Sequence, residues 1–581
     1  MQPVDLTTLT AVCAELRDGW LPARLEQVYQ RDRHMVSLAL RTLEGRSWLN
    51  ICWHPQAAHL CLGGPPPRTP DTFTFSQQLK HQLGGLALVA VDLIHPWERV
   101  VDFQFAQRPG EPPLWHLYVE IMGKYSNAIL THADQTIVTA AHQVSRQQSS
   151  VRPIQTGQPY EMPPRMLEDA PSRQESLDDW RDRLCLIPGT LKRNLMKVYC
   201  GLSSNLVVSM LEMADLALDC TTDDLTLADW QRLYERWQEW LQALHQERFK
   251  PGWRSQGYTV MGWGVVQPAS SVQALLDQYY TDQRNQQIFD QLRHQISQRI
   301  LTLQKKLNHK VQDFQSRLVL SEEADRDRQW ADLLMAYGHE WQPGMTQMLL
   351  PDFETHEPIA IPLNPQKTGV QNAQLLYKRH QKLKRSREAI APLLAEAQGD
   401  VAYLDQLEVA IAQLDAYREP TDLSALEDIY EELSQQGYIK DPRRRDRAAS
   451  APDPESFHRY RSPSGFEVLV GRNNRQNDDL TSRLATDYDL WFHTQQIPGS
   501  HVLLRLDAGR VADDADLQFT ANLAAYYSRA RQSDQAPVVY TAPKHVYKPK
   551  GAKPGTVIYK HETVIWGYPQ RVLSSAIVRM P

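Results

Sequence analysis

The sequence has few cysteines and no long apolar run. Six cysteines are present, and none forms a Cys-x-x-Cys pair: Cys13, Cys52, Cys61, Cys185, Cys200 and Cys220. This spacing offers no metal-ligand pattern and is typical of reduced, mostly buried thiols in a cytosolic protein. No window approaches the roughly 18 consecutive apolar residues that a membrane span needs. Residues 1–21 lack a basic stretch followed by an apolar one, so we expect no signal peptide and a soluble, cytoplasmic protein.

The chain also lacks a large net charge. Its 63 Lys and Arg residues oppose 69 Asp and Glu residues, and the formal charge of −6 excludes a protein whose whole surface is a polycation. Any face that binds nucleic acid must therefore be local. At 581 residues the chain is too long for one hydrophobic core. A guide of about 150 residues per domain predicts three or four folded units.

The first 270 residues show two kinds of apolar pattern. Residues 1–165 start with a helical spacing over residues 6–16 and then change to short alternating runs such as MVSLALRTL and LWHLYVEIM. Alternation over short runs is typical of half-buried strands, so we predict a β-rich domain. Residues 166–270 carry amphipathic segments with a tight connection at residues 201–203. They predict a small helical domain that is compatible with a helix-hairpin-helix.

From residue 271 to 436 the pattern becomes long and helical. Apolar residues recur at steps of three and four in two stretches, which a proline-rich, strand-like segment at residues 340–368 separates. Such steps are typical of coiled-coil seams, so we predict a long antiparallel helical arm with a β tip. A partner-binding arm and a simple spacer remain equal alternatives. The seam residues are Ile296, Ile300, Leu303, Leu307, Val311, Phe314 and Leu318, and then Leu404, Leu407, Ile411 and Leu414.

The last 145 residues contain a polar stretch and a final domain. Residues 437–455 are charged and rich in Pro, Ala and Ser, which is typical of a flexible linker. Residues 456–581 alternate strand-like runs with one helical segment at residues 514–531. This pattern fits an α/β or α+β domain, and we predict α/β. The whole chain is thus predicted to be a multidomain α+β protein.

Two histidines surround a Pro-Gly-Ser turn in DLWFHTQQIPGSHVLLRL, residues 489–506. His493 and His501 lie eight residues apart without a third His, Cys or carboxylate at ligand spacing, so we predict no metal site. Ser500 and His501 are neighbours on a strand and point to opposite faces, which argues against a catalytic dyad. Two readings stay open: histidines that bond to the turn backbone, or histidines that contact RNA.

Basic residues gather in two places. One is TAPKHVYKPKGAKPGTVIYK, where lysines and tyrosines interleave without an acidic residue. Ammonium groups beside aromatic rings suit a nucleic-acid backbone, although a solvated lysine-rich loop is the alternative. The other is YKRHQKLKRSRE in the arm, which is either a solvated helix face or a second RNA contact. The predicted RNA-binding residues are His493, His501, Arg505, Lys544, Lys548, Lys550 and Lys553, together with Lys378, Arg379, Lys382, Lys384 and Arg385. The amides of NNRQNDDL are expected to add polar contacts.

Several segments resemble bacterial NFACT proteins, the RqcH group of ribosome quality-control factors, which have also been described as fibronectin-binding protein A homologues. The resemblance is carried by RLEQVYQRDRHMVSLALR, GKYSNAIL and RPIQTGQPYEMPP in the first domain and by CGLSSNLVVSML in the second. It continues with YGHEWQPGMTQMLLPDF and NAQLLYKRHQKLKRSRE in the arm. GRNNRQNDDLTSRLATDYDLWFHTQQIPGSHVLLR and KPKGAKPGTVIY carry it in the last domain.

The resemblance implies four domains: NFACT-N, helix-hairpin-helix, a coiled-coil middle domain and the RNA-binding NFACT-R domain. It implies a factor that binds a large ribosomal subunit, through rRNA and a stalk-base ribosomal protein, while peptidyl-tRNA is still bound. Such a factor recruits charged tRNA, in bacteria tRNA-Ala, for template-free alanine tailing that marks the nascent chain for degradation. Peptidyl transfer belongs to the ribosome, so the resemblance implies a non-enzymatic monomer without catalytic residues, cofactor or membrane contact.

The resemblance also implies a tRNA-binding pair. The family carries an Asp-Arg pair tied to tRNA recruitment, and the matching positions here are Glu98 and Arg99, with Glu98 expected to orient Arg99. A second departure is LKHQLGG around Lys80 and His81, where relatives are more basic. NFACT-N also resembles DNA glycosylases, but this chain starts Met-Gln-Pro and has no late cysteines for a zinc finger. A surface adhesin and a ribosome-binding module without tailing activity are the alternative functions.

Overall fold

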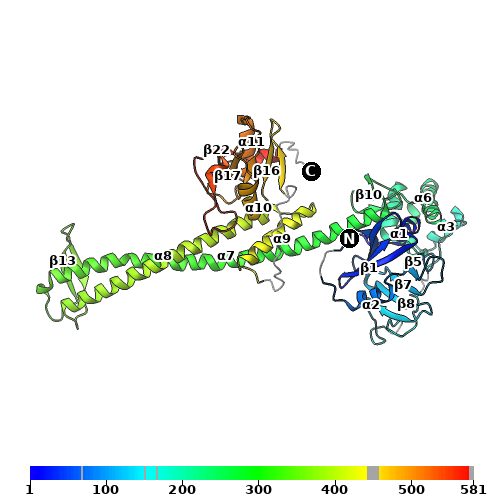
Figure 1. The fold of residues 1–581 in the computed structure, drawn as a ribbon, viewed down its shortest axis with the longest axis horizontal. Coiled ribbons are helices and arrows are strands. Elements are labelled where there is room, and N and C mark those ends of the chain that lie inside the picture. The colour runs from blue at the N-terminus through cyan, green and yellow to red at the C-terminus, as the bar shows by residue number, and fades with distance from the viewer. Residues whose placement is uncertain (67–69, 150–151, 165–167, 441–456, 575–581) are drawn as a thin grey trace. The chain divides into compact units, whose positions relative to one another are not determined.

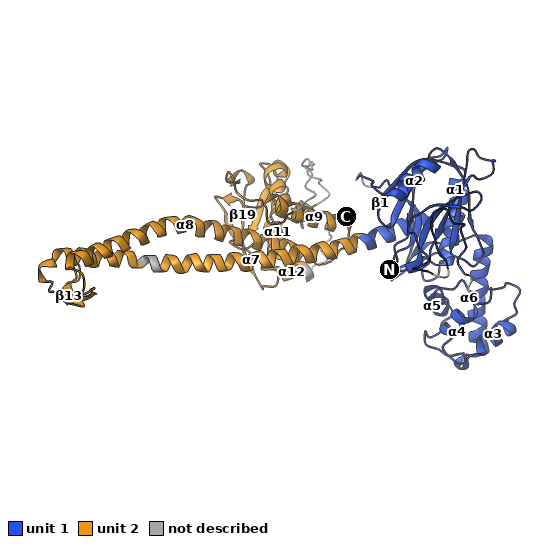
Figure 2. Cartoon of the chain, turned by 90° about the horizontal axis from the view of Figure 1, so that it is seen from below, with its two compact units in different colours: residues 1–284 blue, residues 285–581 orange. Residues whose placement is uncertain are grey.

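The computed structural model describes residues 1–66, 70–149, 152–164, 168–440 and 457–574, with the side chains of 320–322, 573 and 574 left out. Two compact units divide the chain, Met1–Arg284 and Asn285–Pro581 (Figure 2). Most of the linker predicted at residues 437–455 lies outside the described residues. The five-segment division therefore stays a prediction.

The first unit is built on an antiparallel sheet, some of whose strands are labelled in Figure 1. Its nine strands follow the order β4-β3-β2-β1-β5-β6-β7-β8-β9. Its strands are β1 Ala23–Asp32, β2 Met35–Arg41, β3 Arg46–Cys52, β4 His59–Gly63, β5 Ala87–Leu93, β6 Val100–Ala106, β7 Trp115–Glu120, β8 Asn127–His132 and β9 Ile137–Ala140. Its helices are α1 Leu6–Trp20 and α2 Thr74–Leu83. The predicted β-rich N-terminal region is confirmed.

Helix α1 shows how the sequence sets the position of one helix. Asp5 caps it by accepting a hydrogen bond from the Thr8 backbone at 2.9 Å, which satisfies a free amide of the first turn. Its apolar side chains Leu9, Val12 and Leu16 repeat every three or four residues and are fully buried in the core of the first unit. The helix is therefore fixed at its N-terminus and along one face.

A second core in the first unit is formed by helices and tryptophans. The helices are α3 Leu177–Cys185, α4 Leu191–Val198, α5 Ser204–Met213 and α6 Leu227–Gln246. Trp180, Trp237 and Trp240 are fully buried between them. The helix-hairpin-helix assignment stays a prediction. Three short strands follow α6 in the same range: β10 Gly252–Trp253, β11 Tyr258–Thr259 and β12 Gln267–Pro268. Helix α6 ends at its C-cap residue Glu247, which adopts a left-handed φ of 52°.

Two long helices follow. Helix α7 is Val272–Ala336 and α8 is Gly369–Gln413, and the hairpin of β13 Gln347–Pro351 and β14 Pro358–Pro362 joins them. Within the second unit they run side by side in opposite directions (Figures 1 and 2). The Gln304 amide donates to Asp405 at 2.9 Å, and the His380 ring lies 2.8 Å from the Ala324 carbonyl. The coiled-coil assignment itself stays a prediction. Helix α9, Pro420–Gln435, packs onto the α7–α8 pair.

The C-terminal region forms a six-stranded sheet in the order β15-β16-β18-β17-β19-β22. Its strands are β15 His458–Arg461, β16 Glu467–Val470, β17 Leu490–Thr494, β18 Val502–Leu504, β19 Ala536–Thr541 and β22 Thr563–Gly567. Every pairing is antiparallel, so the α/β prediction for this domain is wrong and the domain is α+β. The predicted helix is present as α11 Asp514–Tyr526 and covers one face of the sheet. Smaller elements are α10 Asn474–Asp479, the π-helix η5 Leu480–Leu484, β20 Val546–Tyr547, β21 Ile558–Tyr559 and α12 Gln570–Ser574.

Candidate nucleic-acid interface

The lysine-rich segment covers the face of the C-terminal sheet that points away from α11. Successive strand residues alternate between the faces, so Phe492 and Val538 pack toward α11 while Trp491 and Val539 point the other way. Val546, on the lysine-rich segment, packs into the cluster around Trp491. The segment is thus anchored by apolar contacts, and its charged side chains lie above a rigid sheet.

His501 lies in the core of this arrangement. Its side chain is only 2% exposed, and its Nδ1 is 2.7 Å from the Thr481 hydroxyl and 3.1 Å from the Asn477 carbonyl. Burial lowers the pKa of His501 to about 3, so the ring is neutral at physiological pH. The prediction that His501 contacts RNA phosphate is wrong, and the alternative of a histidine bonded to nearby backbone is the observed one.

The other predicted residues of the 489–506 segment are more accessible. His493 is half-buried, and its Nε2 lies 3.3 Å from the Gly499 carbonyl, while burial lowers its pKa. Arg505 is exposed and pairs with the Glu467 carboxylate at 3.3 Å. An exposed ion pair of this kind is weak, so Arg505 can exchange its partner for a phosphate. RNA contact by His493 and Arg505 stays a prediction.

The lysines of the basic segment fall into two groups. Lys544, Lys548 and Lys550 are exposed, and only Lys548 among them pairs with a described residue, the Asp478 carboxylate at 2.5 Å. Lys553 points inward instead. Its ammonium pairs with Asp400 on α8 and lies 4.8 Å from the centre of the Tyr403 ring and 2.6 Å from the Tyr438 hydroxyl. Because it is held by these groups, Lys553 docks the domain onto the helices, and RNA contact by Lys553 stays a prediction.

Arg472 and the NNRQNDDL segment that follows it have the same docking role. The Arg472 side chain is 3% exposed and pairs with Asp422 at 3.1 Å and Glu419 at 2.8 Å, both at the start of α9. The Asn474 amide donates to Glu432 at 3.1 Å. The Asn474 amide thus faces α9, and RNA contact by the other amides of this segment stays a prediction. The local sequence does not show which distant carboxylates Arg472 and Asn474 contact.

Glu432 gives this docking site a pH dependence. Its carboxyl accepts hydrogen bonds from the Tyr403 hydroxyl at 2.5 Å and from Asn474, and burial raises its pKa from 4.5 to about 7. The folded protein therefore keeps a proton that the unfolded chain releases, and this contribution to stability is lost as the pH rises from about 4.5 through 7. The full effect is about 3 kcal/mol.

We expect Glu432→Gln to remove this pH dependence. The amide keeps the shape and the hydrogen-bonding partners but cannot lose a proton. The measurement is hydrogen exchange of α9 amides in wild type and variant across this pH range, corrected for the intrinsic exchange rate at each pH. The pH dependence due to buried His501 has the opposite sign and cancels in the comparison. Equal pH profiles for the two proteins would contradict the assignment.

The basic cluster of the arm lies on an exposed face of α8. Lys378, Lys382 and Arg385 are spaced by four and three residues and share one side of the helix. Lys384 is also exposed. Arg379 pairs with α7 through Glu323 at 3.2 Å and Asp327 at 3.1 Å. Lys378, Lys382 and Arg385 remain better predicted RNA contacts than Arg379, because Arg379 contributes to the pairing of α8 with α7.

Glu98 and Arg99 lie in the turn between β5 and β6. Both residues are half-buried, and no ion pair joins them within the described part of the chain, so the orientation of Arg99 by Glu98 stays a prediction. The preceding Trp97 fixes the turn, since its ring packs 5.9 Å from Trp240 and against Gly201. Gly201 has φ of 77° and no room for a Cβ beside that ring. The half-buried Arg99 guanidinium is thus presented from a rigid turn. Lys80 and His81 are exposed on α2.

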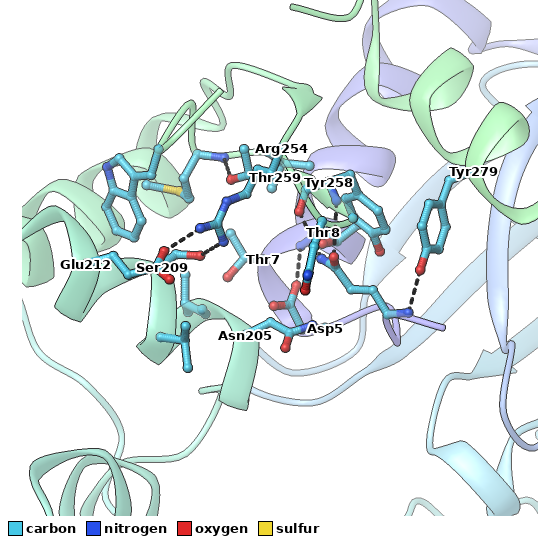
Figure 3. A pocket seen from close by; sticks show the side chains of 18 of the residues that line it. Asp5, Thr7, Thr8, Asn205, Ser209, Glu212, Arg254, Tyr258, Thr259 and Tyr279 are labelled. Carbon is cyan, nitrogen blue, oxygen red and sulfur yellow. Dashed lines mark hydrogen bonds and ion pairs between the residues drawn. The ribbon is translucent and has the colours of Figure 1, made fainter. Parts of the chain in front are cut away.

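The first unit also contains a polar cavity of about 520 Å³ between α1, α5 and β11 (Figure 3). Arg254 donates to the Ser209 hydroxyl at 2.6 Å and pairs with Glu212. Asp5 caps α1 and accepts from the Ser203 hydroxyl at 2.6 Å. Arg254 therefore joins the segment after β10 to α5, and Asp5 joins the start of α1 to the start of α5.

Within the described ranges, His, Cys, Asp and Glu side chains form no cluster of three or more that could hold a metal ion. None of the helices in that part of the chain combines the length and apolarity that crossing a membrane requires.

Comparison with known proteins decides the family. Residues 5–451 match the model for NFACT N-terminal and middle domains, and residues 456–561 match the NFACT protein RNA binding domain. The chain belongs to the NFACT family. It is 28% identical to the Rqc2 homolog RqcH of Bacillus subtilis (strain 168), over 96% of each chain. It is 29% identical to the protein of that name in Streptococcus suis (strain 05ZYH33), over 95% of each chain. The NFACT resemblance seen in the sequence is confirmed.

Solved structures of parts of such proteins are also similar. The C-terminal part of the fibronectin/fibrinogen-binding protein from Streptococcus suis shares 28% identity with a TM-score of 0.33, covering 48% of this chain and 98% of that one. Its N-terminal part shares 22% identity with a TM-score of 0.38, covering 48% of this chain and 99% of that one. TM-scores this low carry no argument about fold or function.

Proposed function

We propose that this NFACT protein is a cytoplasmic ribosome quality-control factor. It binds large ribosomal subunits that carry peptidyl-tRNA and recruits charged tRNA, with tRNA-Ala as the expected species. It directs template-free addition of alanine to the C-terminus of the nascent chain, which marks that chain for degradation. The observation that carries the proposal is the collinear similarity to proteins named Rqc2 homolog RqcH over 96% of both chains.

The structure supports a positioning role. Two exposed basic surfaces lie in the second unit, on the lysine-rich segment and on α8, and both suit RNA phosphates. The long helical pair, which we propose is a coiled-coil arm with a β tip, reaches a stalk-base ribosomal protein. The protein acts as a monomer, and the ribosome performs peptidyl transfer. The four-domain assignment with a helix-hairpin-helix at residues 166–270 belongs to this proposal.

Arg99 is proposed to contact the recruited tRNA. We expect Arg99→Ala to weaken tRNA retention about 5- to 150-fold, since a charge-assisted contact contributes about 1–3 kcal/mol. Binding to the large subunit should be unchanged, because the basic surfaces of the second unit remain. The measurement compares tRNA and large-subunit rRNA recovered with each variant.

The matched control is Arg108→Ala, which removes an exposed arginine from the loop after β6 in the same domain. Equal tRNA loss in the two variants would contradict a specific role for Arg99. Tailing is tested separately by mass spectrometry of a stalled reporter chain in cells with and without the protein. C-terminal alanine additions that depend on the protein support the proposal. If large subunits bind but no tail forms, the protein is a ribosome-binding module without tailing.

A further inference from the structure

A cavity of about 450 Å³ lies beside the lysine-rich segment in the C-terminal domain. Its walls come from α10, from the π-helix η5 and from β20 with the residues that follow it. This volume falls within the range of about 300–1,000 Å³ that is usual for small-molecule sites. None of the residues predicted from sequence, apart from Lys548, lines it.

One side of the cavity is aromatic and apolar. Tyr547 is 44% exposed, and Val546 and Val557 continue the surface beside it. The Lys560 ammonium lies 5.6 Å from the centre of the Tyr547 ring. An exposed tyrosine ring beside cations is the surface on which nucleobases stack, because every base has a flat π face.

The rim of the cavity carries three cations. Lys548 pairs with Asp478 at 2.5 Å, Arg483 with Asp479 at 2.9 Å, and Arg475 with Glu431 at 3.4 Å. These pairs are solvent-accessible, so each contributes little and can be exchanged. A phosphate can accept two parallel hydrogen bonds from one arginine side chain, so it competes well with a carboxylate for that arginine. The rim therefore suits an anionic ligand whose apolar part lies against Tyr547.

The wall between rim and core is a π-helix, a rare form that occurs often at functional sites. Its ring is closed by the hydrogen bond from the Ala485 backbone to the Leu480 carbonyl at 3.0 Å. Thr481 ties it to the core through the Asn477 carbonyl at 2.9 Å and the buried His501 ring. His501 thus has a positioning role: it holds the wall that presents Ser482 and Arg483 to the cavity.

We propose that this cavity binds one unstacked nucleotide of single-stranded RNA. The base packs on Tyr547, and the adjacent phosphates lie on Arg483 and Lys548. The proposal rests on the RNA-binding function and specifies its subsite. Exposed Lys544 and Lys550 on the same segment continue the positive surface for neighbouring phosphates. Duplex RNA does not fit, because its base faces are covered by stacking.

The test is binding of a fluorescein-labelled oligouridylate of about 12 nucleotides to the full-length protein. We expect Tyr547→Ala to weaken binding about 5- to 150-fold, from about 1–3 kcal/mol per stacked base, and Tyr547→Phe to bind like wild type. The control is Trp566→Ala, which removes a ring of similar exposure, 49%, from edge strand β22 outside the cavity. A duplex of the same length should not distinguish wild type from Tyr547→Ala.

Three results would overturn the nucleotide site. They are equal binding by wild type and Tyr547→Ala, an equal loss with duplex RNA, or a loss in Trp566→Ala that matches that of Tyr547→Ala. Any of these, with large-subunit binding intact, removes the subsite and leaves the proposed function standing. If the wild-type protein binds neither oligouridylate nor large subunits, both the nucleotide site and the proposed function are contradicted.

Discussion

Neutralising Lys544, Lys548 and Lys550 with glutamine should flatten the salt dependence of large-subunit binding. Each phosphate contact releases about 0.7–0.9 counterions, so the loss of three contacts lowers the slope of log K against log salt concentration by about 2–3 units. All three ammonium groups are exposed, and Lys544 and Lys550 are free of ion pairs with described residues. Affinity should fall most at low salt, where screening is weakest.

Two controls separate this effect from a general change in charge. Glutamines at Lys305, Lys306 and Lys310, which are exposed on α7, change the net charge equally and should leave the slope unchanged. Lys553→Gln should also keep the slope but loosen the domain from α8, because its ammonium is held by Asp400 and Tyr438. An unchanged slope in the first triple variant would show that the lysine-rich segment does not contact RNA.

Arg472→Met should destabilise the junction between α9 and the C-terminal domain by about 3–5 kcal/mol. The guanidinium is 3% exposed and the Asp422 side chain 5%, so removal of the cation leaves a buried carboxylate without its charge partner. Asp422 would keep only the backbone amides of Arg418 and Glu419, at 2.9 and 3.1 Å. The loss is therefore far larger than that of a surface ion pair.

Hydrogen exchange of α9 amides in the full-length protein measures this local stability without requiring two-state unfolding. A loss of 3 kcal/mol increases exchange about 150-fold. Arg475→Met is the matched control, because Arg475 lies three residues farther on, in α10, and pairs with the same helix at 3.4 Å or more but is 35% exposed. Its expected cost is about 0–1 kcal/mol. Equal exchange in the two variants would contradict the buried pair.

Local patterns in the sequence predict several elements well. The spacing of Leu9, Val12 and Leu16 predicts α1, and Ile296 and Ile300 fall on the buried side of α7. These predictions succeed because the apolar repeat that decides which side of a helix is buried lies within one continuous segment. The run of lysines also predicts an exposed basic surface, and Lys544, Lys548 and Lys550 are exposed in the structure.

Contacts between residues far apart in the sequence could not be predicted from local patterns. Lys553 looks like its neighbours in sequence, yet it meets Asp400, which lies 153 residues away. The burial of His501 depends on the π-helix packed over it, and the cavity beside Tyr547 depends on three separate segments. Strand direction in the C-terminal sheet is also set by tertiary pairing, because a short apolar run indicates a strand without showing the direction of the strand beside it.

The most direct test of the central claim is to purify the wild-type protein from growing cells and sequence the RNA that remains bound. The account predicts enrichment of large-subunit rRNA together with one class of tRNA, expected to be tRNA-Ala, over RNA recovered with an unrelated protein. Recovery of large-subunit rRNA without any enriched tRNA would contradict tRNA recruitment. Recovery of neither RNA would contradict the ribosomal role altogether.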